Sequence, residues 1–188
     1  MNTTSHDLQE PAPGELELVR EFVNTYDAET GEESLGSPEQ LASWLRGHGL
    51  LEDRRQTRPA DLDKAIDIRE ALRSLLLANN GVAAEPAAVE RLRQASREAK
   101  LELAFRGDGT SPVEPNAPGV AGALGRILTR VHAAMADGSW ERLKVCPADD
   151  CLWAFYDRSR NRSRRWCEME VCGNRAKVRG YRERRSRG

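Results

Sequence analysis

The 188-residue sequence contains no long hydrophobic run, no internal repeat and no recognisable catalytic motif. No apolar stretch approaches the roughly 18 residues of a membrane span, and residues 1–15 lack the basic and then apolar pattern of a signal peptide. The three histidines lie far apart, and neither a phosphate-binding loop nor a dinucleotide fingerprint occurs. We therefore expect a cytoplasmic protein that neither spans a membrane nor acts as an enzyme.

The composition, 39% hydrophobic and 31% charged, is typical of a folded soluble protein. Its net charge of -1 conceals a division: residues 1–139 carry 15 basic against 23 acidic residues, a net charge of -8, whereas residues 140–188 carry 14 against 7, a net charge of +7. Such an asymmetry suggests that the C-terminal part alone meets a polyanion. Arginine supplies 25 of the 29 basic residues, which suits contacts with phosphate and guanine, although a GC-rich genome would also favour it.

Hydrophobic periodicity predicts that residues 1–139 form a mainly α-helical bundle, preceded by a disordered segment over residues 1–14. Val19, Phe22, Val23 and Tyr26 would form one apolar stripe on the first helix. Ser37 is the expected N-cap of the second. Helices are predicted over residues 15–29, 37–47, 61–80, 85–98 and 119–138.

A small β-hairpin is expected within the bundle, because Leu101, Leu103 and Phe105 alternate before a Gly-Asp-Gly turn. The proline-rich residues 110–119 are predicted to form a loop. Apolar faces that include Val89 and Met135 are expected to turn inward on the fourth and fifth helices.

Four cysteines give the pattern C-x4-C, fifteen residues, C-x4-C. Two close pairs separated by a hairpin-sized insert are typical of a tetrahedral four-sulfur zinc site, so Cys146, Cys151, Cys167 and Cys172 are the predicted ligands of one Zn²⁺ per chain. Four thiolates would fill the coordination sphere, which argues against a catalytic metal. The alternatives are two disulfides or four buried free thiols.

Residues 140–188 are thus predicted to be a small zinc-bound module, treble-clef-like or zinc-ribbon-like, with a β-hairpin and a helix. Alternation over residues 152–156 predicts a strand that returns through Trp166. A helix beginning after Cys172 would turn Val178 and Tyr181 toward the hairpin and its basic residues outward. The expected nucleic-acid contacts are Arg160, Arg162, Arg164, Arg165, Arg175, Lys177, Arg179 and Arg182.

Two stretches of the module, W-x-F-x-D-x-S-x-N from Trp153 and R-R-W-C-x-M-x-x-C-G-N-R-x-K from Arg164, resemble the CGNR zinc finger. Upstream, LELVREFVNTYD resembles the opening of the ABATE domain that usually precedes this finger. The resemblance implies a stress-induced transcription regulator of bacteria, with zinc held by the four cysteines and double-stranded DNA contacted by the finger. The alternative is a zinc-stabilised interaction module that binds protein or RNA without specific DNA readout.

The helical part would then carry either a small-molecule effector site or a homodimer interface, and the sequence does not decide between them. Asn24 and Thr25 lie beside the apolar stripe of the first helix and could line a pocket with Trp44 and His132. Such residues more often cap or bridge helices.

Overall fold

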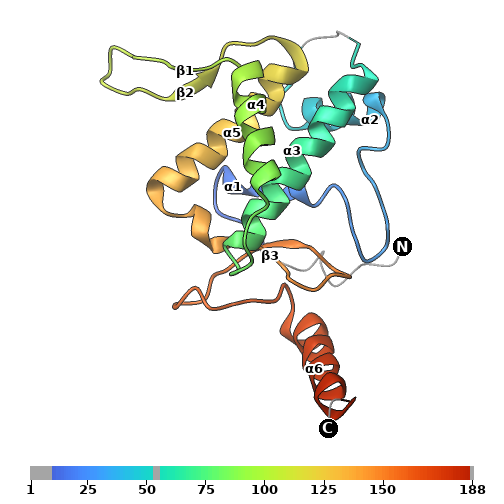
Figure 1. Cartoon of the computed structure of the whole chain (residues 1–188). Coiled ribbons are helices and arrows are strands. Elements are labelled where there is room, and N and C mark those ends of the chain that lie inside the picture. Colours follow the sequence, from blue (N-terminus) through green and yellow to red (C-terminus); the bar gives the residue numbers. More distant parts are fainter. Residues whose placement is uncertain (1–9, 53–55, 187–188) are drawn as a thin grey trace.

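The first five helices form a bundle, and a cysteine-bearing β-hairpin and a sixth helix follow them (Figure 1). The core that these helices share is mainly aliphatic. The computed structural model describes residues 10–52 and 56–186. The fold is mainly α-helical, as predicted. The elements are α1 (Leu16–Val23), α2 (Pro38–Gly47), α3 (Pro59–Ala78), α4 (Pro86–Glu98), β1 (Leu101–Leu103), β2 (Val113–Pro115), α5 (Gly119–Asp137), β3 (Leu143–Val145), β4 (Ala154–Tyr156) and α6 (Asn174–Ser186).

Membrane insertion of these helices is not indicated: within the described residues, none is both long and apolar enough to cross a bilayer.

The starts of α2 and α3 follow the capping chemistry of the sequence. Ser37 has extended backbone geometry, and its hydroxyl accepts a hydrogen bond from the Gln40 backbone N–H, with Pro38 in the first turn. At α3, the Asp61 carboxylate accepts a hydrogen bond of 2.9 Å from the Arg58 backbone N–H. These contacts satisfy N–H groups that have no partner inside the helix.

The apolar stripe predicted that the first helix continues to Tyr26, but α1 ends at Val23. Two buried arginines, Arg69 and Arg73, bind the chain that follows it. Arg69 donates to both carboxylate oxygens of Glu33 at 2.7 and 2.8 Å. Arg73 donates to the carbonyl oxygens of Val23 and Tyr26 at 2.5 and 3.2 Å. The backbone oxygens at the end of α1 are thereby satisfied without a further helical turn.

Two predicted inward-facing side chains lie at the surface instead. Val89 on α4 is 39% exposed, and Ala88 is the buried residue of that helix; Met135 on α5 is 46% exposed. Helix α5 ends where expected, at Gly138, whose left-handed φ of 77° suits glycine.

The predicted hairpin is present, but its second strand lies in the segment that was expected to be a loop. β1 pairs antiparallel with β2, and Leu101 lies opposite Pro115. Prolines are tolerated here because each strand has only one neighbour in this two-stranded sheet. Phe105 does not continue the pattern of burial, since its side chain is 82% exposed beyond the end of β1.

Two glycines let the chain around the hairpin pack closely against α5. A Cβ atom on Gly122 would lie 2.0 Å from the carbonyl oxygen of Ala117, and one on Gly125 would lie 2.6 Å from the Cβ of Ala99. Alanine at Gly122 is therefore expected to destabilise the protein by about 1–3 kcal/mol, because a backbone carbonyl must move and this outweighs the gain in helix propensity.

Urea unfolding followed by circular dichroism measures this effect. Gly47→Ala is the matched control, since a Cβ there meets no atom within 4 Å and the residue is also helical. A Gly122→Ala protein as stable as the control variant would contradict the close packing.

Disorder was predicted for residues 1–14, of which residues 1–9 lie outside the described part, but residues 10–14 have a defined position and one of them is buried. Ala12 is buried, and its N–H donates to the Glu17 carboxylate at 2.5 Å. The carbonyl oxygen of Pro11 accepts from Arg158 at 2.6 Å.

The hydrophobic core continues across the predicted boundary between residues 139 and 140. β3 pairs antiparallel with β4, with Val145 opposite Ala154. Leu143, Val145 and Ala154 are fully buried in the same cluster as the helices, and β3 lies against α3. The base of the cysteine module is thus part of the main core, while α6 extends away from the bundle (Figure 1).

Candidate zinc centre and nucleic-acid interface

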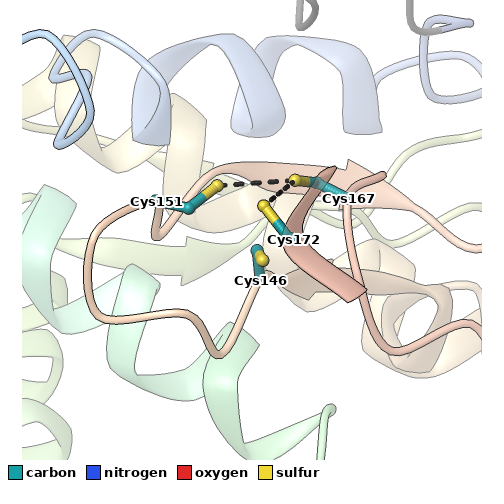
Figure 2. A group of neighbouring side chains, drawn as sticks. All are labelled: Cys146, Cys151, Cys167 and Cys172. Carbon is teal, nitrogen blue, oxygen red and sulfur yellow. Dashed lines mark hydrogen bonds between the residues drawn. The ribbon is translucent and has the colours of Figure 1, made fainter. Parts of the chain in front are cut away.

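All four cysteine sulfurs converge on one point (Figure 2). They lie within 4.8 Å of one another, with 3.4 Å between the Sγ atoms of Cys151 and Cys167 and 3.6 Å between those of Cys167 and Cys172. A tetrahedral zinc with bonds of about 2.3 Å separates its sulfurs by about 3.8 Å. The spacing of the four buried thiols therefore fits one zinc ion.

Three separate segments bring the ligands together. Cys146 directly follows β3, and Cys151 lies shortly before β4, so the first pair occupies the turn of a hairpin. Cys167 comes from the returning loop, and Cys172 lies in a short π-helical turn that leads into α6. A hairpin that supplies two ligands, with the last ligand at the start of a helix, is the treble-clef-like form of the predicted module.

The hairpin itself differs from the predicted one. The alternation over residues 152–156 marks a true strand, β4, but its partner is the upstream strand β3 and not the chain returning to Trp166. β3 was missed because Lys144 interrupts a short apolar run, and its side chain is buried here.

Charge explains why this cluster needs a cation. Hydrogen bonds with Cys146 and Cys151 raise the pKa of the Cys167 thiol, and burial raises the pKa of Cys172. A hydrogen bond from Cys151 lowers the pKa of Cys146 to about 2. Without a metal, the four thiols therefore do not all ionise, and Cys146 is the favoured place for the negative charge. A divalent zinc ion stabilises all four as thiolates, the donor set of structural zinc sites.

Aromatic side chains cover the centre as a second, small core. Phe155 is buried beside the cysteines, and Trp153 and Trp166 pack against them partly buried. A Cβ on Gly173 would lie 2.4 Å from the Met169 sulfur and 3.2 Å from the Trp166 ring, so the glycine after Cys172 permits this close packing.

A buried ion pair shapes the basic loop over residues 158–165. The ammonium of Lys144 lies 2.7 Å from the Asp157 carboxylate, and both side chains are almost fully buried. Lys144 also donates to the carbonyl oxygens of Arg162 and Arg164 at 2.6 and 3.1 Å. Asp157 accepts the backbone N–H groups of Ser159 and Arg164, both at 2.9 Å. The pair thus fixes the loop from within.

The arginines of this loop have different environments. Arg160 is exposed, and Arg162 forms an ion pair with Glu141. Arg164 points back into the module, where it donates to the carbonyl oxygens of Trp166 and Cys167 and lies over the Phe155 ring. Arg164 nevertheless remains exposed at the surface of the loop.

Arg165 lies over the Trp166 ring, with the guanidinium carbon 5.7 Å from the ring centre. The carbonyl oxygen of Arg165 accepts a hydrogen bond of 2.6 Å from Asn80.

On α6, two predicted contact residues have acidic partners within the protein. Arg175 lies 2.6 Å from Glu29 and 3.6 Å from Asp150, and Arg179 lies 3.8 Å from Asp150.

The remaining predicted residues of α6, Lys177 and Arg182, are exposed. Val178 is 50% exposed and does not dock on the hairpin as expected; the side chain of Tyr181 lies outside the described part.

Three asparagines that the sequence did not single out for this purpose attach the module to the bundle. Asn24 accepts the backbone N–H of Ala154 at 2.8 Å and donates to its carbonyl oxygen at 2.9 Å. Asn79, at the end of α3, donates to the carbonyl oxygens of Trp140 and Leu143, and Asn80 donates to those of Val145 and Arg165. The NNG sequence that signals the end of α3 thus also anchors β3 and the basic loop.

The pocket predicted from Asn24, Thr25, Trp44 and His132 is replaced by separate roles for these residues. Thr25 is buried and accepts a hydrogen bond from Arg69 at 3.2 Å. Trp44 stacks on the His48 ring, and His132 lines a depression between β2 and α5. Asn24 bridges to β4. Asn24 and Thr25 thus bridge elements that are distant in sequence, which is the commoner use of such residues.

Fold and site together define a helical-domain protein with a C-terminal four-cysteine zinc finger. A family model for the CGNR zinc finger matches residues 142–185. The model of the ABATE family, described as "Putative stress-induced transcription regulator", matches residues 16–138. This second match covers more than half of the chain, so the protein belongs to the ABATE family. Comparison with curated proteins found no match.

Proposed function

We propose that the protein is a DNA-binding transcription regulator whose zinc finger contacts duplex DNA through the basic loop and α6. The observation that carries the proposal is that one metal centre supports both basic elements. Cys167 closes the loop over residues 158–165, and Cys172 lies in the turn that starts α6. A zinc-fixed scaffold holds cationic side chains in place for phosphates, which reduces the entropy lost on binding.

The charge distribution supports the same orientation on DNA. The segment from residue 140 carries a net charge of +7, and the preceding residues carry -8. Phosphates attract the first and repel the second, so the finger would approach the duplex with the helical domain turned away. A regulator of this kind acts in the cytoplasm, the compartment expected from the sequence.

The exposed cations are the main candidates for phosphate contacts. Replacing Arg160, Lys177 and Arg182 together by glutamine is expected to weaken binding to a labelled duplex and to lower the slope of log affinity against log salt by up to about 3, since each phosphate contact contributes about 0.9. Fluorescence anisotropy over a salt series measures both quantities.

The matched control replaces Arg46, Arg93 and Arg97 by glutamine, which removes the same charge from exposed positions of the helical domain. An unchanged slope in the finger variant, with zinc retained, would remove these residues from the interface. If structured RNA or an acidic protein displaces the duplex while unlabelled random DNA does not, the finger is an interaction module instead.

A further inference from the structure

Helices α3, α4 and α5 line an open cavity of about 550 Å³ that lies apart from the zinc finger. Small-molecule sites in proteins range from about 300 to 1,000 Å³, so this volume suits a ligand of modest size. Three of the side chains that line it are short: Ala87 and Ala95 on α4 and Ala121 on α5. Its position also differs from that of the pocket predicted from the sequence.

The floor of the cavity is apolar, and its mouth is charged. Ile68 and Leu124, both nearly buried, contribute to the floor. At the mouth, the ammonium of Lys64 on α3 lies 2.6 Å from the carboxylate of Glu98 on α4. An apolar interior with a few polar groups at its rim is the usual form of a ligand site, and it selects molecules with an apolar body and a polar end.

The sign of the charge at the rim favours a cation. Among the described lining residues, four carboxylates face three cationic side chains. Asp61 pairs with Arg58, and Glu98 with Lys64, whereas Asp67 has no ion-pair partner within the described part of the chain. The same is true of Arg91, so an anionic ligand is the alternative that an experiment must exclude. The net charge of -8 over residues 1–139 favours a cationic over an anionic ligand, because the electrostatic potential around the domain attracts positive charge.

We propose that this cavity binds a small amphiphilic cation, with its apolar body between α3, α4 and α5 and its positive charge at Asp67. Such a ligand class includes planar aromatic cations and apolar amines. The site does not depend on whether the finger binds DNA.

Berberine, a planar aromatic cation that fluoresces when it leaves water, is a suitable probe for the full-length, zinc-loaded protein. Wild-type protein is expected to give saturable fluorescence enhancement. Ala121→Leu is expected to abolish it by filling the cavity, and Asp67→Asn is expected to weaken it about threefold, the loss of one ion pair at an exposed carboxylate.

Two matched variants serve as controls. Ala133→Leu adds the same side chain to the other side of α5, where it lines the depression beside β2, and Asp63→Asn removes an exposed carboxylate from α3 outside the cavity. Both are expected to bind the probe like wild type. Circular dichroism establishes that each variant is folded.

Several results would overturn the proposal. They are no saturable berberine binding to wild type, equal losses for Asp67→Asn and Asp63→Asn, and retained binding in a folded Ala121→Leu protein. Tighter binding of the anion anilinonaphthalene sulfonate at the same site, lost in Arg91→Gln, would assign the cavity to anions and also refute it.

Discussion

Replacing Cys167 with serine is expected to release the zinc and to unfold the cysteine-bearing loops and α6, while β3 and β4 stay in the core of the bundle. Three remaining sulfurs bind the ion far more weakly than four, and metal binding contributes on the order of 10 kcal/mol to the folding of small zinc modules. The small core around the cysteines is too small to support this part of the chain alone, because few of its buried side chains are not cysteines.

The helical bundle is expected to remain folded in this variant but to unfold at a lower temperature. Leu143, Val145 and Ala154 belong to its core, so disorder next to β3 and β4 weakens packing inside the bundle as well. Elemental analysis measures the zinc, expected to fall from one ion per chain to none. Amide NMR spectra separate the two regions by their dispersion.

Val171→Ser is the matched control for Cys167→Ser. It places the same residue type beside the metal cluster, at a position that packs against the cysteines without supplying a ligand. This control is expected to keep one zinc per chain and a dispersed spectrum for α6. Equimolar zinc in Cys167→Ser, or an unchanged finger spectrum, would contradict the four-sulfur site.

Removing the charge of Lys144 is the second change with a large expected effect. Lys144→Met is expected to destabilise the protein by about 3–5 kcal/mol, because the Asp157 carboxylate would remain buried without its cation. The carbonyl oxygens of Arg162 and Arg164 would also lose their donor, so the basic loop should lose its fixed shape.

A double-mutant cycle measures the coupling between the two charges. The double variant Lys144→Met/Asp157→Leu is expected to be less destabilised than the sum of the two single variants, since no unpaired buried charge remains. Urea unfolding gives the free energies. A Lys144→Met protein within about 1 kcal/mol of wild type would show that the pair does not hold the loop.

The same pair predicts sensitivity to acid. Burial acts to raise the pKa of Asp157, but hydrogen bonds from Lys144 and Ser159 and the charge of Lys144 outweigh it and lower the pKa below its ordinary value. The stabilisation is therefore complete above an ordinary carboxyl pKa of about 4 and is lost as the pH falls through the lowered value. In Asp157→Asn this part of the acid dependence should be absent.

Local chemistry made several elements of this protein predictable. Ser37 and Pro38 favour the start of a helix and Gly138 favours its end, because capping depends on neighbours in the chain. The zinc centre could be predicted equally well from the sequence, since the spacing of the cysteines places each pair of sulfurs on a short turn.

Most of what the sequence did not reveal concerns side chains whose partners are distant in the chain. Lys144 and Arg69 resemble surface charges, yet they are buried because Asp157 and Glu33 reach them across 13 and 36 positions of the chain. Val89 lies on the apolar stripe of its helix but is exposed, since α4 has neighbours on too few sides to cover the whole stripe.

The sequence alone determined that this protein is mainly helical, that four sulfurs meet at one zinc, and that positive charge gathers at its C-terminal end, because these properties follow from periodicity, spacing and composition. The tertiary structure decided that β3 pairs with β4, that Asn79 and Asn80 join the finger to the bundle, and that a cavity opens between α3, α4 and α5. Each of these features depends on contacts between residues that are distant in the chain. Burial and hydrogen bonding determine those contacts only when the whole core is assembled.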